Sequence, residues 1–250
     1  MKVRSLFYGL LCVLALGTML VSCSDDDNGE VWDDNGSTVS LPRERVYILN
    51  EGTMGYNNAT LAFYAPNGDA DFISDIYKLQ NNGASLGDTG QDMLEYDGCI
   101  YISVYGSNYL AKLNAAGVEQ ARVSFVDDAD LSGGIRYMAA EDGYIYASFY
   151  GGVVAKINAN TLQVENKLTG LGSNLEGVAI EDGRLYVANS YTVTPDGQYV
   201  YNTDVFVVDL RTFTLADTLK VVQNPNMLLE EDDHVCLISW DYSREQYVLQ

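Results

Sequence analysis

The segment that decides the fold is Asp142-Gly143-Tyr144-Ile145-Tyr146-Ala147-Ser148, in the middle of a chain of 250 residues. Three other segments resemble it: residues 97–103 read DGCIYIS, residues 182–188 read DGRLYVA, and residues 232–238 read DDHVCLI. The segments begin 45, 40 and 50 residues apart. Asp-Gly between two apolar runs is typical of a tight β-hairpin, because glycine accepts the positive φ that such a turn requires. The chain therefore contains a repeated hairpin.

Each repeat predicts four strands. Around the central segment these strands span residues 135–141, 144–149, 153–158 and 163–168. Four-stranded units at this period are typical of β-propeller blades, whereas a sandwich would not repeat at blade length and a parallel β-helix would repeat sooner. No stretch after residue 45 shows sustained helical periodicity. We therefore predict an all-β propeller.

The repeat register divides the chain into blades. They span residues 45–79, 88–126, 133–169 and 174–222, with a partial blade from residue 224. The first blade lacks a strand before Val46, and the last ends at Gln250 after its second strand and a loop. About four and a half blades do not close a ring, and an open sheet edge promotes aggregation. We expect a fragment of a longer, seven-bladed protein whose last blades also complete the first; dimerisation is the alternative.

The first 22 residues predict an export signal. Lys2 and Arg4 precede an apolar run that ends at Leu20-Val21-Ser22-Cys23. A charged start, a short apolar core and a small residue before the cleavage site are typical of a secretory signal. A permanent membrane span is disfavoured, because the run is slightly short and no positive flank follows it.

The residues around Cys23 resemble the lipobox of bacterial lipoproteins. This resemblance implies that Cys23 is acylated and anchors the protein in a membrane. The following Ser24-Asp25-Asp26-Asp27 resembles the surface-export signal of Bacteroidetes lipoproteins, which implies display on the outer face of the outer membrane. An acidic tether that faces the periplasm is the alternative. Residues 23–44 are polar and acidic and predict a flexible tether before a propeller of residues 45–250.

Charge indicates which partners the protein can bind, and cysteine content indicates whether a disulfide can form. Without Lys2 and Arg4, 12 basic and 35 acidic residues leave a net charge of −23. Such a surface repels nucleic acid and anionic membranes, so no nucleic-acid partner is expected. The body contains only Cys99 and Cys236. An oxidising compartment would permit a disulfide, but both cysteines fall in predicted inner strands of different repeats, which favours two buried thiols.

Two stretches resemble known propellers. Leu185-Tyr186-Val187-Ala188-Asn189, followed by Asp204-Val205-Phe206-Val207-Val208-Asp209-Leu210, is similar to the YVTN repeat of YncE-like and surface-layer propellers. The opening Val46-Tyr47-Ile48-Leu49-Asn50-Glu51-Gly52 resembles a Bacteroides group of surface propeller lipoproteins, the DUF5074 type. The resemblance extends over most of residues 45–240 and implies fold more than function.

The relatives that we connect with this group are the BtuG-type surface proteins. They are seven-bladed propellers that capture cobalamin and pass it to an outer-membrane transporter. The resemblance implies a surface lipoprotein that binds a nutrient, with a corrinoid as the most specific candidate, and delivers it to a transporter. The step from fold to function is an analogy, because one fold hosts many functions.

The repeat register places candidate ligand-binding residues on one face, formed by the loops before each first strand and after each second strand. These residues are Glu51, Asp92, Tyr105, Arg136, Tyr137, Tyr150, Asn174, Glu176, Tyr191 and Trp240. Aromatic rings with a few oriented polar groups suit an amphipathic ligand such as a corrin or a glycan; packing between blades is the alternative for each ring. The segment from Ser190 to Asp204 also carries Tyr199 and Tyr201, and is either a functional loop or an extended hairpin.

The sequence argues against an enzyme. The only histidine, His234, falls in a turn on the opposite face, and neither a Cys/His metal spacing nor a Gly-rich phosphate loop occurs. We therefore expect no cofactor or metal. Carboxylate-only chemistry, as in lactonase or lyase propellers, stays open, since Glu51, Asp92 and Glu176 could converge on the propeller axis. A protein–protein adaptor at the outer membrane is a further alternative.

Overall fold

The computed structural model describes residues 32–65, 72–241 and 246–249. Cys23 and the predicted signal of residues 1–22 lie outside the described residues, so lipid attachment stays a prediction. Within these described ranges, no helix is long and apolar enough to cross a membrane.

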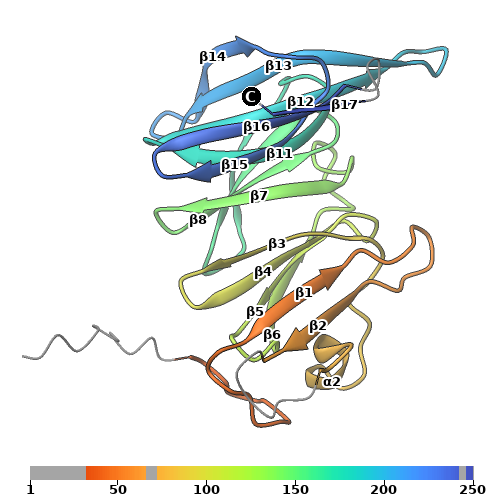
Figure 1. Ribbon diagram of the computed structural model, residues 1–250, viewed down its shortest axis with the longest axis vertical. Helices are drawn as coiled ribbons and strands as arrows, with labels where there is room; N and C mark the ends of the chain where they lie inside the picture. Colours follow the sequence, from red (N-terminus) through yellow and green to blue (C-terminus); the bar gives the residue numbers. More distant parts are fainter. Residues whose placement is uncertain (1–31, 66–71, 242–245, 250) are drawn as a thin grey trace, which may run out of the picture. The chain divides into compact units, whose positions relative to one another are not determined.

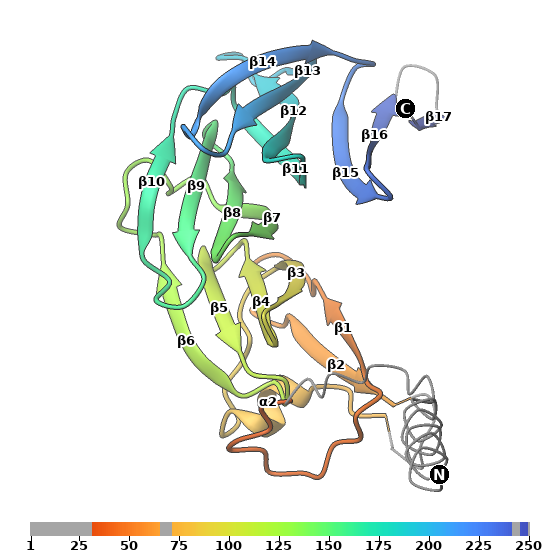
Figure 2. The same ribbon diagram turned by 90° about the vertical axis from the view of Figure 1, so that its left-hand side faces the viewer.

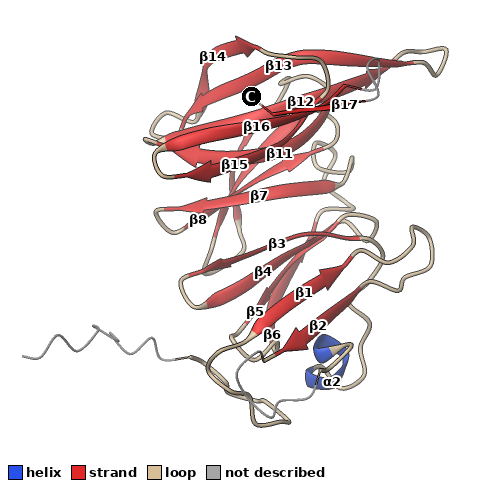
Figure 3. Cartoon of the chain, viewed as in Figure 1, coloured by secondary structure: helices blue, strands red, loops and turns tan. Residues whose placement is uncertain are grey.

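Nearly all of the regular structure in the described residues is antiparallel sheet (Figures 1 and 3). The first sheet pairs β1 (Val46–Asn50) with β2 (Thr60–Tyr64). The second contains β3 (Gly90–Tyr96), β4 (Cys99–Val104), β5 (Tyr109–Leu113) and β6 (Glu119–Ser124), and the third β7 (Ile135–Glu141), β8 (Tyr144–Phe149), β9 (Val153–Asn158) and β10 (Val164–Leu168). The fourth contains β11 (Asn174–Glu181), β12 (Arg184–Val193), β13 (Tyr199–Asp209) and β14 (Thr214–Lys220), and the last β15 (Pro225–Glu231), β16 (His234–Asp241) and β17 (Gln246–Leu249).

The second, third and fourth sheets confirm the predicted four-stranded blades. The strands β7, β8 and β9 have the predicted bounds, and β10 begins one residue later than predicted. The repeated turns also have the predicted geometry: Asp142 and Gly143 have φ angles of 50° and 82°. Two successive positive φ angles define a type I′ turn, whose twist matches that of the flanking strands. In the last repeat Asp232 and Asp233 adopt the same conformation, with φ of 48° and 61°.

The first strands of successive blades pack on one another. Figure 2 shows β3, β7, β11 and β15 following in order, and β7 contacts β3 while β11 contacts both β7 and β15. Gly177 in β11 allows a close approach, because a Cβ at this position would lie 2.6 Å from the carbonyl oxygen of Asn226 and from the amide nitrogen of Leu228. The glycine thus fixes the spacing of β11 and β15.

The apolar core is distributed between neighbouring blades. Tyr101 and Leu110 of one blade share a buried cluster with Ile145 and Phe149 of the next. A smaller cluster joins Val205 to residues of β15 and β16. Burial between sheets explains why β5 is buried along its whole length, since the second sheet contributes residues to an apolar cluster on each of its faces.

Three features differ from the sequence prediction. A short helix, α2 (Ile76–Gln80), follows β2, with Asp75 as its N-cap. The last sheet contains a third strand, β17, where only a loop was predicted. Cys99 and Cys236 are free, as expected, but both are half-buried rather than buried.

The residues before β1 are the fourth difference. From Trp32 onward the predicted tether packs against the domain: the Thr38 amide donates to Gln80 Oε1 at 2.8 Å, and Arg45 Nη1 lies 2.8 Å from Asp34 Oδ1. Val39 and Leu41 contact the apolar cluster beneath β1. Residues 32–44 therefore belong to the same compact unit as the blades.

Candidate ligand-binding site

Four polar side chains occupy one repeated position in the first strands of successive blades. Each lies six residues before the first residue of its repeated turn; they are Gln91, Arg136, Glu176 and Asn226. Side chains of equivalent register meet where the strands that carry them pack together. We call this set the polar row.

Arg136 and Glu176 form the centre of the polar row. Arg136 Nε and Nη2 donate to Glu176 Oε2 at 2.9 and 2.7 Å, and Nη1 donates to Gln91 Oε1. The Tyr150 hydroxyl donates to the other carboxylate oxygen of Glu176. Only 14% of the Arg136 side chain and 4% of the Glu176 side chain are exposed. The ion pair is therefore buried, each guanidinium nitrogen has an acceptor, and both carboxylate oxygens have a donor.

Aromatic rings surround the Arg136 guanidinium. Its central carbon lies 4.5 Å from the ring centroid of Tyr150, 4.9 Å from that of Tyr105 and 5.7 Å from that of Tyr137. Tyr105 and Tyr150 also meet edge to face at 5.5 Å. Cation–π attraction of this kind holds the charge in place away from water.

The pKa values of Glu176, Arg136 and Tyr150 are all raised, through burial and through the charges of their neighbours. Burial raises the pKa of Glu176 above its ordinary value, against the opposing effect of the Arg136 charge and the Tyr150 hydrogen bond. Burial alone would lower the pKa of Arg136, but the charge and hydrogen bond of Glu176 together with the Tyr150 and Tyr137 hydroxyls outweigh it and hold that pKa above its ordinary value. Burial, and then the Glu176 charge, raises the pKa of Tyr150. Arg136 therefore stays charged and Tyr150 stays a phenol at neutral pH.

A line of tyrosines leads from this pair to the surface. The ring centroid of Tyr191 lies 6.1 Å from that of Tyr150 and 5.3 Å from that of Tyr199. Asn174 Nδ2 donates to the carbonyl of Tyr191 at 2.9 Å, which ties the last part of β12 to the start of β11. Tyr199 is 64% exposed.

A cavity of about 300 Å³ lies beside these tyrosines. Its aromatic lining consists of Tyr150, Tyr191, Tyr199, Tyr201 and Trp240. Its polar lining consists of Arg136, Glu176, Ser190, Asn224 and Asn226. The lining comes from the third, fourth and fifth sheets, so the cavity depends on the packing of these blades. We call it the tyrosine cavity.

One polar atom in the wall of the tyrosine cavity has no partner. Asn224 is satisfied, because it accepts from Ser190 Oγ at 2.5 Å and donates to the Trp240 carbonyl at 2.8 Å. Asn226 is only 4% exposed, and its Oδ1 is the one buried side-chain N or O atom of the described residues without a hydrogen bond. Buried polar atoms are nearly always hydrogen-bonded in folded proteins, so this exception points to a missing ligand group.

A comparison with family models identifies the chain. The model described as "Domain of unknown function (DUF5074)" matches residues 44–236. The chain belongs to the DUF5074 family. A comparison of this DUF5074 chain with curated proteins finds no match.

Solved structures similar to the DUF5074 chain share its fold at low sequence identity. The designed Ika8 protein aligns with a TM-score of 0.56 at 10% identity, over 80% of this chain and 53% of that chain. The WD40 β-propeller domain of Doa1 aligns with a TM-score of 0.54 at 9% identity, over 80% of this chain and 58% of that chain. Sqt1 of Saccharomyces cerevisiae aligns with a TM-score of 0.53 at 8% identity, over 82% of this chain and 58% of that chain. The DUF5074 chain thus has a β-propeller fold and spans just over half the length of these structures.

The structure brings most of the predicted ligand-binding residues together. Those at the polar row or the tyrosine cavity are Tyr105, Arg136, Tyr137, Tyr150, Asn174, Glu176, Tyr191 and Trp240. Asp92 instead accepts from the amide of Met138 at 2.8 Å, and burial raises its pKa. Glu51 is exposed in the β1–β2 loop, where its carbonyl accepts from the Gly90 amide.

The three carboxylates that could have converged do not form a cluster. Within the described residues no group of three His, Cys, Asp or Glu side chains could hold a metal ion. Glu176 is engaged by Arg136 and Tyr150, whereas Asp92 supports the backbone of β7. His234 is exposed at the start of β16, and its Nδ1 lies 2.6 Å from the carbonyl oxygen of Asp232.

The predicted ligand-binding residues do not include two members of the polar row, Gln91 and Asn226, or the buried Ser190. Gln91 and Asn226 could have been found from the repeat, since both stand six residues before a repeated turn, as Arg136 and Glu176 do. Ser190 gives no such signal, because its position depends on an irregularity in the pairing of β12 with β13 between Asn189 and Tyr191.

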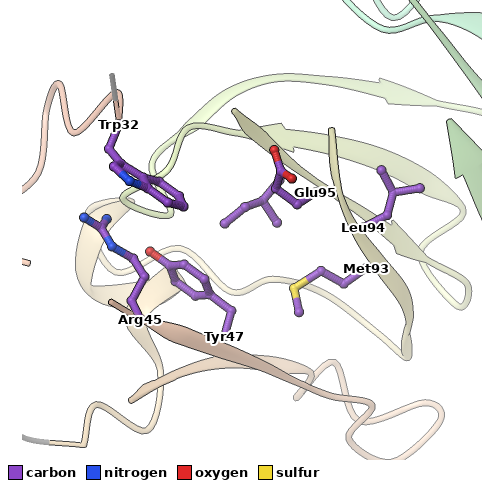
Figure 4. A pocket seen from close by; sticks show the side chains of 7 residues that line it. Trp32, Arg45, Tyr47, Met93, Leu94 and Glu95 are labelled. Carbon is purple, nitrogen blue, oxygen red and sulfur yellow. The ribbon is translucent and has the colours of Figure 1, made fainter. Parts of the chain in front are cut away.

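A second cavity, of about 220 Å³, lies near the first two sheets (Figure 4). Trp32, Tyr47, Met93 and other apolar groups line it. Arg45 lies over the Trp32 ring, 5.2 Å from its centroid, and donates to Asp34 and to the carbonyl of Ala115. This cavity lacks a buried polar atom in need of a partner, so the tyrosine cavity is the stronger candidate among the described residues.

Proposed function

We propose that this DUF5074 protein is a lipid-anchored protein of the outer-membrane surface that binds a small-molecule nutrient in the tyrosine cavity and delivers it to a transporter. The observation that supports binding most directly is the buried, unpaired Oδ1 of Asn226 in an aromatic-lined cavity of about 300 Å³. Cavities of this size with a few oriented polar groups are typical of ligand sites. The membrane anchor rests on the sequence around Cys23.

The polar row suits a binding site because it is rigid before any ligand arrives. Arg136 is held by Glu176, Gln91 and surrounding rings, so its position does not depend on a ligand. A preorganised wall lowers the entropic cost of binding. The exposed Tyr199 lies at the end of the tyrosine line, where it can contact a ligand that enters from solvent.

Isothermal titration calorimetry of the mature chain against a ligand panel tests binding. The panel contains cyanocobalamin, neutral oligosaccharides, uronate oligosaccharides and amino acids. We expect micromolar or tighter binding of one class, reduced at least tenfold by Tyr191→Ala, with a matched control in Tyr56→Ala. Tyr56 is 74% exposed in the β1–β2 loop and does not line the cavity. Absence of binding for every class contradicts the proposal.

The location is tested separately in cells. A Cys23→Ser variant is expected to lose metabolic labelling by palmitate and to leave the membrane fraction. The wild-type protein is expected to be degraded by protease added to intact cells. Protection from protease in intact cells would contradict surface display.

A further inference from the structure

The lining of the tyrosine cavity also indicates the class of its ligand, provided that the cavity binds one as proposed above. We infer that the ligand is a neutral carbohydrate. One sugar ring packs against the tyrosines, and one of its hydroxyl groups donates a hydrogen bond to Asn226 Oδ1.

The charges of the cavity favour a neutral ligand. Arg136 and Glu176 are the only charged side chains in its lining, and they neutralise each other at 2.7 Å. An anionic ligand would meet a guanidinium whose charge Glu176 already neutralises and would approach a chain of formal net charge −21. A cationic ligand would have to compete with Arg136 and Tyr150 for the carboxylate oxygens. Since desolvating a charge without a partner is costly, both kinds of ion are disfavoured.

The polar groups of the cavity require a hydrogen-bond donor from the ligand. Ser190 already donates to Asn224, and the Asn224 amide already donates to the Trp240 carbonyl, so these groups are occupied. Asn226 Oδ1 is buried without a partner. A ligand hydroxyl can satisfy this acceptor, and a site that leaves a buried acceptor unpaired without its ligand rejects analogues that lack the donor.

The aromatic lining supplies the complementary apolar surface. The Tyr191 and Tyr199 rings lie 5.3 Å apart with planes inclined at 46°, and Tyr199 is 64% exposed. Tyrosine combines a rigid apolar face with a polar edge and holds amphipathic groups at low entropic cost. A pyranose has the matching form, with an apolar C–H face and a rim of hydroxyl groups. A volume of about 300 Å³ is at the lower end of the range for ligand pockets, which suits one sugar ring and not an enclosed macrocycle.

Matched neutral and charged sugars test this inference by calorimetry. The probes are galactose and glucose oligosaccharides, the corresponding galacturonate and glucuronate oligosaccharides, and cyanocobalamin. We expect a neutral oligosaccharide to bind at least tenfold more tightly than its uronate. We expect Asn226→Leu to weaken that binding tenfold or more, Tyr199→Ala to weaken it, and Tyr56→Ala to leave it unchanged.

The stability of Asn226→Leu without ligand distinguishes a lost contact from a lost fold. Leucine has nearly the same shape as asparagine and removes the unpaired polar group, so the melting temperature of the variant is expected to equal or exceed that of the wild type. A folded variant with unchanged sugar affinity overturns the inference. Binding of cyanocobalamin or of a uronate with no neutral sugar bound overturns the inference but leaves the proposed function standing. No binding by any probe class in the wider panel overturns both.

Discussion

Removing both members of the buried Arg136–Glu176 pair should cost less stability than the sum of the two single removals. In Arg136→Met the Glu176 carboxylate, only 4% exposed, loses the guanidinium that neutralises it. Breaking a buried pair in this way costs about 3–5 kcal/mol, because the remaining charge is buried without a partner. In the double variant Arg136→Met/Glu176→Gln no unpaired charge remains, and the cost should fall below the sum of the single costs by about 0.5–3 kcal/mol.

Urea unfolding of the four proteins of this cycle measures these free energies, provided that each unfolds in one transition. Lys220→Met is the matched control, since the Lys220 side chain is 73% exposed in its pair with Asp204. An exposed pair contributes less than about 1 kcal/mol.

The pH dependence of the stability of Arg136→Met is a second test of the unpaired Glu176 charge. Burial already raises the pKa of Glu176, and loss of the neighbouring cation raises that pKa further. An acid whose folded-state pKa exceeds its unfolded-state pKa loses stability as the pH rises. The deficit of Arg136→Met relative to the wild type should therefore shrink as the pH falls from about pH 8 to about pH 5. Two results together would refute a buried, coupled pair. In the cycle, each single variant would lose less than about 1 kcal/mol of unfolding free energy and the two losses would add; in the pH series, the deficit of Arg136→Met would not change between about pH 8 and about pH 5.

Three further predictions concern the scaffold. Gly177→Ala places a methyl group 2.6 Å from backbone atoms of β15 and should cost about 1–3 kcal/mol in the free energy of unfolding, measured in urea. Asp233 adopts a left-handed conformation with φ of 61°, which glycine adopts without strain. Asp233→Gly should therefore raise the free energy of unfolding by about 0.5–1 kcal/mol, seen as a higher urea midpoint; a lower midpoint would contradict the assigned turn. Burial raises the pKa values of Tyr109 and Tyr146 to about 12. The unfolded chain therefore loses these protons at a lower pH than the folded protein, so the stability that the two phenols contribute is complete below about pH 10 and should be lost as the pH rises to about pH 12. Tyrosinate absorbance should accordingly show a late-titrating group in the folded protein.

Local pattern predicted the blades well because each hairpin is defined by nearby residues. The Asp142-Gly143 turn and the alternation around it were sufficient to place β7, β8 and β9. The helix α2 was missed because five residues are too few to show helical periodicity. It is stabilised by distant contacts, such as that of the Tyr77 hydroxyl with Glu119 Oε2 at 2.5 Å.

The order of residues 32–44 was not predictable from their polar composition. These residues pack through pairs distant in sequence, such as Thr38 with Gln80 and the carbonyl of Asn35 with Asn114. The candidate site was predicted in larger part, because its aromatic residues follow second strands in a regular register. Asn226 was not singled out, since an unpaired acceptor is visible only once its surroundings are folded.

A crystal structure of the protein with the tightest-binding sugar of the panel tests the central claim most directly. We predict ligand density in the tyrosine cavity, with a hydroxyl oxygen within about 3.2 Å of Asn226 Oδ1 and the sugar ring packed on Tyr191 or Tyr199. The Arg136–Glu176 pair should be unchanged from its geometry without ligand. Density for the sugar elsewhere on the molecule, with the cavity unoccupied and Asn226 Oδ1 still unpaired, would contradict the account.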